Sequence, residues 1–314
     1  MRRVLVTGAT GFLGARVLAP LQARGFEIHV AGRSPPKCQQ VVFHQADILQ
    51  AEQLRSAVQS ARATHLLHLA WYAEPGQFWG SPLNLDWVSA SLNLVRTFVE
   101  TGGSRAVIAG TCAEYQWGPD RFYETESRCA PETLYGASKD ALRRVLMAYA
   151  DIAPLSLAWG RIFFLYGPGE KRGRLVSDAI CALLSGAAFP TSHGLQRRDF
   201  MHVCDAASAF AALLDSDVTG PVNIGSGEAA TLRSLLELIA EETGNANCIE
   251  FGARPLSLKE PPIIEADIMR LSHEVKFQPK YNLRMGLAEA VAWWRTERDT
   301  SAKLQSRASR ERDC

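Results

Sequence analysis

The stretch that most constrains the fold lies at the N-terminus, where a strand, a glycine loop and a helix follow one another. Val4-Leu5-Val6-Thr7 is apolar and β-branched, which is typical of a buried strand. Glycines then recur at positions 8, 11 and 14, and residues 12–24 have the pattern of a helix. In this context the glycines permit a tight turn and let the backbone approach the pyrophosphate of a dinucleotide at the helix N-terminus. We therefore expect a dinucleotide site formed by Gly8, Thr10, Gly11, Phe12, Leu13 and Gly14.

The patterns after this loop predict an α/β fold with a doubly wound parallel sheet. Near-continuous apolar strands alternate with amphipathic helices up to about residue 165, as in a sheet covered on both faces. We predict a Rossmann-like dinucleotide domain over 1–165, a smaller and discontinuous C-terminal substrate lobe mainly over 166–296, and a disordered charged tail over 297–314. Some later segments are expected to return to the first domain. The expected strands are 4–7, 26–32, 41–44, 64–70, 104–109, 155–164, 198–203 and 222–224, and the expected helices are 12–24, 50–61, 82–101, 133–150, 175–185, 205–214, 232–243 and 285–298.

The composition allows a large core and argues against several kinds of partner. Of the 314 residues 47% are hydrophobic, and the net charge of +1 gives no reason to expect nucleic acid or an anionic membrane surface. No apolar run has the length of a membrane span, and the N-terminus lacks the pattern of a signal peptide. The seven cysteines are scattered without metal-binding spacing. Free thiols in a reducing, cytoplasmic compartment are therefore expected.

The end of the second strand bears on the choice between the two nicotinamide dinucleotides. An NAD site places Asp or Glu there to bind the ribose 2′-hydroxyl. Here the position is Gly32, followed by Arg33 and Ser34, and a guanidinium suits a 2′-phosphate. We favour NADP(H) and keep NAD(H) as the alternative, because Arg33 can also be an ordinary solvated loop residue. Asp47 and Ile48, which follow the third strand, are expected near the adenine.

Two further stretches end strands at the edge where parallel sheets bind ligands. Leu69, Ala70 and Trp71 close one strand, and Thr111 and Cys112 close the next. Because the carboxyl ends of parallel strands share one edge, the Thr111 hydroxyl should face the same crevice as the glycine loop. Taken alone, Thr111 can also be read as a capping or core residue.

Tyr135 and Lys139 lie four residues apart in a predicted helix, so their side chains share one face. An ammonium beside a phenol favours the phenolate and lowers the tyrosine pKa from about 10. A phenol tuned in this way can exchange a proton with a carbonyl or an alcohol near neutral pH. The spacing also occurs by chance on solvated helix faces, so it gains meaning only beside a cofactor site.

These motifs together resemble the extended short-chain dehydrogenases/reductases, in the branch of nucleotide-sugar epimerases, reductases and dehydratases. The match covers residues 2–296 and also includes His68-Leu69-Ala70, Tyr166-Gly167-Pro168, Arg198 to Val203, Asn223-Ile224-Gly225 and Glu260-Pro261. The resemblance implies that Tyr135 is the acid/base, that Lys139 binds the nicotinamide ribose and lowers the tyrosine pKa, and that Thr111 hydrogen-bonds the reacting oxygen.

The resemblance also implies a nucleotide-diphosphate sugar as substrate, held by the C-terminal lobe. Arg198 is the first candidate for the phosphates and Arg174 the second, and the other expected substrate contacts are Trp71, Cys112 and Phe164. Similar proteins form a four-helix interface, which implies a homodimer through helices 82–101 and 133–150.

Departures from the family pattern narrow the reaction. Dehydratases of this branch carry an acid two residues after the threonine, where this chain has Ala113, with Glu114 one residue further on. On an extended segment that offset turns the side chain away, which argues against 4,6-dehydration. Phe164, Ser257 and Trp87 replace an Asn, an Arg and an Asn of the family, so an unusual substrate pocket is expected.

Two reactions and one non-enzymatic role remain from the sequence. Since NADPH is the usual donor in biosynthesis, Gly32-Arg33-Ser34 favours a ketoreductase that converts a nucleotide-linked 4-keto-6-deoxysugar to the 4-hydroxy sugar. The alternative is a 4-epimerase, which retains and recycles NAD. A non-catalytic, NADP-sensing regulator on the same fold is less favoured, because Thr111, Tyr135 and Lys139 are all present.

Overall fold

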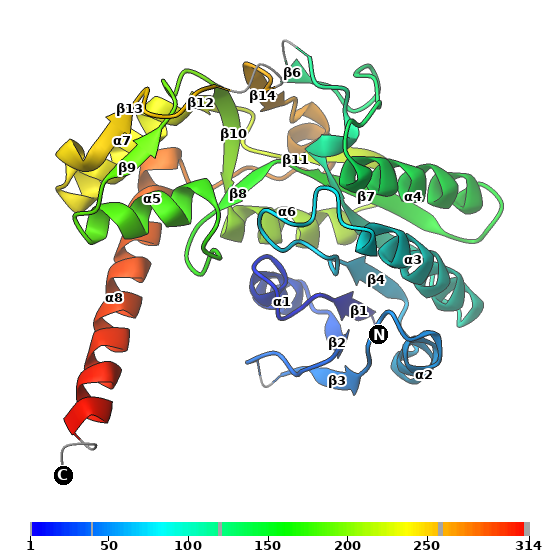
Figure 1. Ribbon diagram of the computed structural model, residues 1–314. Coiled ribbons are helices and arrows are strands. Elements are labelled where there is room, and N and C mark those ends of the chain that lie inside the picture. The colour runs from blue at the N-terminus through cyan, green and yellow to red at the C-terminus, as the bar shows by residue number, and fades with distance from the viewer. Residues whose placement is uncertain (1, 39, 119–120, 257–259, 311–314) are drawn as a thin grey trace.

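A seven-stranded parallel sheet forms the centre of the protein (Figure 1). The computed structural model describes residues 2–38, 40–118, 121–256 and 260–310. All neighbouring strands in this sheet run parallel, so this is the doubly wound sheet predicted from the sequence. In spatial order its strands are β11 (Gly220–Ile224), β7 (Ser156–Ile162), β5 (Arg105–Thr111), β4 (His65–His68), β1 (Arg3–Thr7), β2 (Glu27–Gly32) and β3 (Val42–Gln45).

Helices cover both faces of the sheet because its strands are apolar on both sides. Along β1, Val4 and Val6 enter one core cluster with helices α1 (Gly14–Ala23) and α6 (Val203–Leu214). Leu5 points to the other face, where the second cluster forms. That face is covered by α2 (Ala51–Ala61), α3 (Leu83–Glu100) and α4 (Leu134–Ala150).

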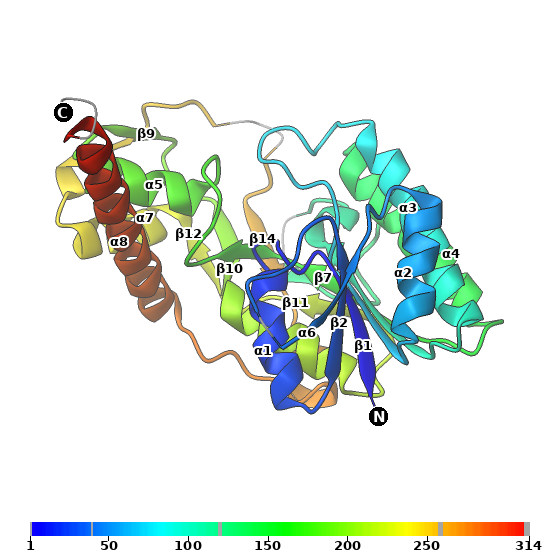
Figure 2. The ribbon, with the colours of Figure 1, turned by 90° about the horizontal axis from the view of Figure 1, so that it is seen from below.

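The rest of the chain forms a second layer of structure beside the sheet (Figure 2). Its helices are α5 (Leu175–Leu184), α7 (Leu232–Thr243) and α8 (Leu283–Arg310), which share a separate apolar cluster. Its sheets contain β12 (Ala229–Thr231), β10 (Arg197–His202), β14 (Ile263–Ala266), β6 (Arg121–Phe122), β8 (Phe164–Tyr166), β9 (Phe189–Thr191) and β13 (Ile249–Phe251). Short helical turns are η1 (Cys112–Glu114), η2 (Ala246–Cys248) and η3 (Arg270–Glu274).

Two of the expected elements extend differently from their prediction. The single strand expected over 155–164 is two strands, because Phe163 donates its N–H to Ile224 and the chain then leaves the first sheet to pair β8 with β10. Helix α8 continues to Arg310, past Glu297, where the charged tail was expected to begin; residues 311–314 lie outside the described residues. Within the described part of the chain, no helix combines the length and the apolar character that crossing a membrane requires.

Candidate active site

The glycine loop is pressed against the end of β4. Gly8 has a φ of 75°, and a Cβ added there would lie 2.7 Å from the Ala70 nitrogen. A Cβ added to Gly14 would lie 2.0 Å from the Gly8 oxygen, so both positions require glycine. Leu13 precedes α1 and gives it no side-chain cap, so the positive end of the helix dipole faces the glycine loop. The loop therefore fits the pyrophosphate of a dinucleotide, with Thr10 and Gly11 exposed and Phe12 partly buried.

The far end of the expected cofactor site lies at β2 and β3. Strand β2 ends at Gly32, and the next residues, Arg33 and Ser34, are exposed. After β3, the Asp47 carboxylate accepts a hydrogen bond from the Leu49 N–H at 3.1 Å, while Ile48 is buried. The charged group that follows the end of β2 is therefore an exposed guanidinium, which suits an added phosphate.

Helix α4 brings Tyr135 to Thr111. Thr133 caps the helix by accepting a hydrogen bond from the Gly136 N–H at 3.1 Å. A Cβ on Gly136 would lie 2.3 Å from the Ala113 oxygen, so glycine alone allows this close approach of α4 to η1. The Thr111 side chain lies close enough to Tyr135 to lower its pKa, against the larger effect of burial, and accepts from the Ala113 N–H at 3.2 Å. The structure thus brings together the threonine and the tyrosine that the sequence singled out.

Lys139 lies one turn further along α4 and is buried. Its Nζ donates to the Ala109 oxygen at 2.7 Å and lies 3.7 Å from the ring centroid of Trp71. Burial lowers the pKa of Lys139 to about 7, although the negative charge of Glu114 opposes the shift. A lysine in this setting changes charge in the neutral pH range.

The pKa of Tyr135 moves in the direction opposite to the sequence expectation. Burial raises the pKa, and it outweighs the opposing effects of the Thr111 hydrogen bond and the Arg174 charge. Lys139 does not reverse this shift, because its ammonium is directed at Ala109 and covered by Trp71. In this state Tyr135 is a phenol at neutral pH and can act as a proton donor.

An aromatic wall that the sequence analysis missed surrounds the tyrosine. Phe78 and Trp79 meet the Tyr135 ring edge-on, at centroid distances of 4.8 and 5.8 Å. The Tyr135 N–H donates to the Trp79 oxygen at 3.0 Å, which fixes this segment to the start of α4. Trp71 and Trp87 continue the wall, 6.1 Å apart. The density of aromatic residues between positions 71 and 87 was the signal that could have revealed it.

The expected substrate contacts fall into separate groups around this wall. The Arg198 guanidinium lies 5.9 Å from the Phe164 ring centroid and forms an ion pair of 2.7 Å with Glu260. Cys112 is also buried, and this burial raises the pKa of its thiol although the charge of Arg198 opposes the shift. Arg174 lies 5.3 Å from the Phe78 ring centroid, on the tyrosine side. Ser257, where the family has an arginine, lies outside the described residues.

Glu114 points away from the crevice, as expected, but for a different reason. The segment after Thr111 is the 3-10 turn η1 and not an extended strand. The turn directs the Glu114 carboxylate behind the site, where it accepts hydrogen bonds from the Thr111 N–H and from Trp159 Nε1, both at 2.8 Å. Glu114 is therefore out of reach of a substrate, because none of its surface is exposed.

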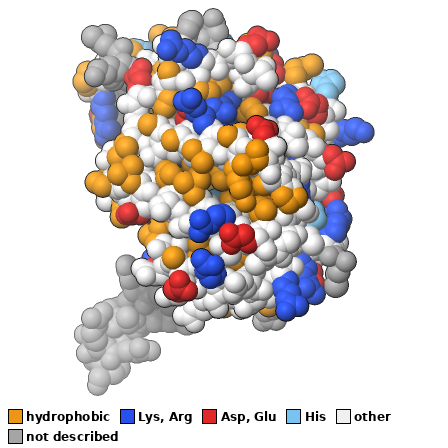
Figure 3. All heavy atoms as spheres, turned by 90° about the vertical axis from the view of Figure 1, so that its right-hand side faces the viewer, with side chains coloured by type: hydrophobic (Ala, Val, Ile, Leu, Met, Phe, Trp, Pro, Cys, Tyr) orange, Lys and Arg blue, Asp and Glu red, His pale blue; other side chains and the backbone are white. Residues whose placement is uncertain are grey.

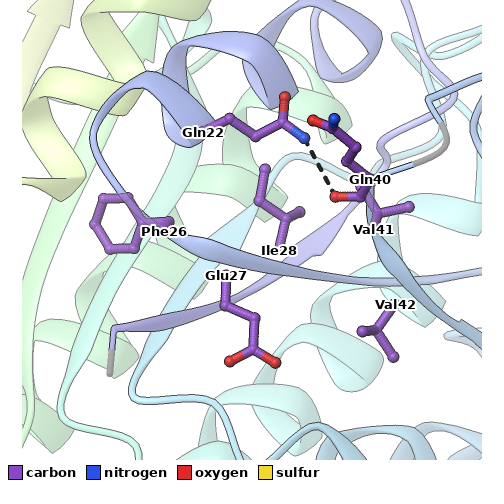
Figure 4. Close-up of a pocket in the computed structure, with 7 residues that line it drawn as sticks. All are labelled: Gln22, Phe26, Glu27, Ile28, Gln40, Val41 and Val42. Carbon is purple, nitrogen blue, oxygen red and sulfur yellow. Dashed lines mark hydrogen bonds between the residues drawn. The ribbon is translucent and has the colours of Figure 1, made fainter.

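A surface pocket elsewhere on the sheet is separate from this site. It has a volume of about 410 Å³ and lies between the end of α1 and the start of β2 and β3 (Figure 4). Its lining includes Gln22, whose amide donates to the Gln40 oxygen at 3.2 Å. Glu27 marks this place as the amino end of β2, whereas the glycine loop and Thr111 lie at carboxyl ends.

The fold and this constellation define a nucleotide-sugar oxidoreductase family. The chain belongs to the NAD dependent epimerase/dehydratase family, whose model matches residues 4–225. The resemblance to the extended short-chain dehydrogenases/reductases drawn from the sequence is thereby confirmed.

Individual relatives extend the similarity over nearly the whole chain. UDP-glucose 4-epimerase of Neisseria meningitidis serogroup B is 26% identical, with 93% of this chain and 97% of that protein covered. UDP-glucuronic acid decarboxylase 1 of Arabidopsis thaliana is 25% identical, with 93% and 70% covered. Among solved structures, the UDP-glucose 4-epimerase of Thermus thermophilus in complex with NAD has a TM-score of 0.83 at 28% identity, with 93% and 99% covered. This chain is thus an enzyme of a family that acts on nucleotide sugars.

Proposed function

We propose that the protein is an NADPH-dependent ketoreductase that converts a nucleotide-linked 4-keto-6-deoxysugar to the 4-hydroxy sugar. The observation that carries the choice is the end of β2, where Gly32 leaves no carboxylate and the exposed Arg33 follows. A carboxylate would repel a 2′-phosphate, whereas a guanidinium attracts it. NADPH is the usual hydride donor in biosynthetic reductions, so a preference for NADPH over NADH supports the assignment as a reductase.

In this proposal the reacting carbonyl lies between Thr111 and Tyr135. NADPH supplies the hydride to the carbonyl carbon when it is bound. Tyr135, a phenol at neutral pH because burial raises its pKa, donates its proton to the oxygen on which negative charge develops. Thr111 hydrogen-bonds the same oxygen, and Lys139 holds the cofactor ribose. Arg198 and Arg174 bind the diphosphate, beside Trp71, Cys112 and Phe164.

A 4-epimerase is the second candidate, and the relatives favour it. The Neisseria protein and the Thermus structure are both UDP-glucose 4-epimerases, and the latter contains NAD. An epimerase would use the same tyrosine to take a proton from the sugar hydroxyl and later return one. A 4-epimerase differs from a ketoreductase in retaining its cofactor. Bound dinucleotide in the purified protein therefore distinguishes the two reactions.

We further propose a homodimer formed through α3 and α4. Hydrophobic side chains gather on the side of the molecule where these two helices lie (Figure 3). Leu85 on α3 is 59% exposed and Val145 on α4 is 52% exposed, although both are apolar. A paired surface would remove such side chains from water.

The proposed reaction is tested with a panel of nucleotide-linked 4-keto-6-deoxysugars, each assayed with NADPH and with NADH. A ketoreductase oxidises one equivalent of NADPH per sugar and is purified without bound dinucleotide. Net oxidation with NADH that equals or exceeds that with NADPH would overturn the cofactor choice. Interconversion of UDP-sugars without net NADPH consumption, by protein that carries tightly bound NAD, would establish the epimerase instead.

A further inference from the structure

Asn84 is a fully buried asparagine whose side-chain amide hydrogen-bonds three residues of the segment between β4 and α3. Its Nδ2 donates to the Phe78 oxygen at 2.8 Å and to the Ser81 oxygen at 2.9 Å. Its Oδ1 accepts a hydrogen bond from Trp71 Nε1, also at 2.8 Å. A buried amide with three such bonds fixes the conformation of the segment around it, because leaving any of these groups unpaired is costly.

The two aromatic residues that Asn84 holds are those that touch Lys139 and Tyr135. The Trp71 ring centroid lies 3.7 Å from Lys139 Nζ, which is within the range of a cation–π contact. The Phe78 ring meets Tyr135 edge-on at 4.8 Å. One asparagine thus connects the surroundings of Lys139 and Tyr135.

We propose that Trp71 and Asn84 form a clamp on the tyrosine–lysine pair, in which the Trp71 face positions and stabilises the Lys139 ammonium and Asn84 holds Trp71 in place. The clamp rests on the proposed function in that it assigns the two residues a positioning role for Lys139 and Tyr135. The contact between the Trp71 indole face and the buried Lys139 ammonium affects the pKa of Lys139, and this effect can be measured without any substrate.

The groups around Lys139 make the Trp71 face a significant contact. Glu114 on η1 is the carboxylate whose charge favours the ammonium, but its oxygens are hydrogen-bonded to Thr111 and Arg161. His68 at the end of β4 is neutral, since burial first and the charge of Lys139 second lower its pKa to about 3. Tyr135 on α4 itself is a phenol, because burial raises its pKa. The π face therefore supplies attraction for a cation that has few other compensating partners.

The substitution Trp71→Leu keeps an apolar cover over Lys139 and removes the π face. A cation–π contact of about 0.5–2 kcal/mol corresponds to a fall in the Lys139 pKa of roughly half a unit to one and a half units. Trp71→Phe keeps a ring but loses the N–H bond to Asn84, so a smaller fall is expected. Asn84→Ala releases Trp71 and should lower the pKa in the same direction.

The pKa of Lys139 can be followed directly by NMR in the full-length protein labelled at lysine Cε. The chain has only seven lysines, and the signal of Lys139 is assigned by its loss in Lys139→Arg. Titration of the wild type should give an inflection near pH 7, and Trp71→Leu should move it down. The matched control is Trp294→Leu on α8, a partly buried tryptophan remote from α4, which should leave the inflection unchanged.

The two residues act as one unit if adding Asn84→Ala to Trp71→Leu causes no further fall in the Lys139 pKa. The alkaline limb of the kcat profile should move with the NMR inflection. A Lys139 pKa in Trp71→Leu equal to that of the wild type would overturn the clamp, as would equal shifts in Trp71→Phe and Trp71→Leu. Failure of the protein to reduce a keto sugar would leave the NMR result intact and would count against the proposed function alone.

Discussion

Glu114 and Arg161 form an ion pair that is sealed behind the candidate site. The distance between Glu114 Oε2 and Arg161 Nε is 2.9 Å, and the two side chains are 0% and 1% exposed. The other carboxylate oxygen holds the Thr111 N–H, so the pair is joined to the backbone of the residue that faces Tyr135. The position of Thr111 thus depends on the buried Glu114 carboxylate, which a substrate cannot reach.

Removing this carboxylate should destabilise the protein strongly. Glu114→Ala leaves the Arg161 charge buried and unpaired, for which we expect a loss of about 3–5 kcal/mol in the free energy of unfolding. Urea denaturation followed by circular dichroism measures it. The control is Glu100→Ala on α3, where an exposed i,i+4 pair with Arg96 contributes less than about 1 kcal/mol. Equal losses in the two variants would contradict the structural role given to Glu114.

The role of the glycine loop in cofactor binding can be tested by substituting Gly14, with a glycine elsewhere in the chain as the control. A Cβ at position 14 would lie 2.0 Å from the Gly8 oxygen, so Gly14→Ala must displace the loop. We expect the Kd for NADPH, measured by calorimetry, to rise by more than about tenfold, equivalent to 1.4 kcal/mol. Gly80→Ala, where an added Cβ meets no atom within 4 Å, should bind NADPH like the wild type. Unchanged binding by Gly14→Ala would remove the loop from the cofactor site.

Arg33 should decide between the two dinucleotides. If its guanidinium binds the 2′-phosphate, Arg33→Ala loses a charge-assisted contact of about 1.5–3 kcal/mol, and the Kd for NADPH rises roughly 10- to 100-fold. The Kd for NADH should not change. Arg55→Ala, an exposed arginine on α2, serves as the charge-matched control. A parallel loss of affinity for both dinucleotides would argue against recognition of the phosphate.

The proposed dimer can be tested at its most exposed apolar positions. Val145→Glu on α4 and Leu85→Glu on α3 would place charges in the paired surface, and each should yield monomers in light scattering coupled to gel filtration. Leu195→Glu is the control, because Leu195 is 62% exposed and lies outside these helices. A wild type that is monomeric at micromolar concentration would refute the interface.

The sequence predicted the central sheet well because its elements carry local patterns. The strand that ends at Thr7 and the glycines that follow specify the first unit, and α7 begins and ends at the predicted residues, Leu232 and Thr243. The short strands β6, β9, β12, β13 and β14 were not predicted, since two to four residues carry too little periodicity. The split of β7 from β8 depends on Ile224, which is far away in the sequence.

The sequence also brought Thr111, Tyr135 and Lys139 to one sheet edge but did not predict their surroundings. Phe78 and Asn84 lie in a stretch without a strong motif, and their contacts form only when that stretch folds back on α4. The pKa of Tyr135 was predicted in the wrong direction because helix spacing reports a neighbouring charge and not burial. Desolvation depends on every element packed around the phenol, which no local pattern encodes.

The proton transfer assigned to Tyr135 is tested most directly by comparing the wild type with Tyr135→Phe in NADPH oxidation by a nucleotide-linked 4-keto-6-deoxysugar. The phenylalanine keeps the ring contacts with Phe78 and Trp79 and removes only the hydroxyl. We predict that kcat falls by about 10²–10⁴-fold while the Kd for NADPH stays the same. A variant that reduces the sugar at a near-wild-type rate would contradict the assignment of Tyr135 as the proton donor.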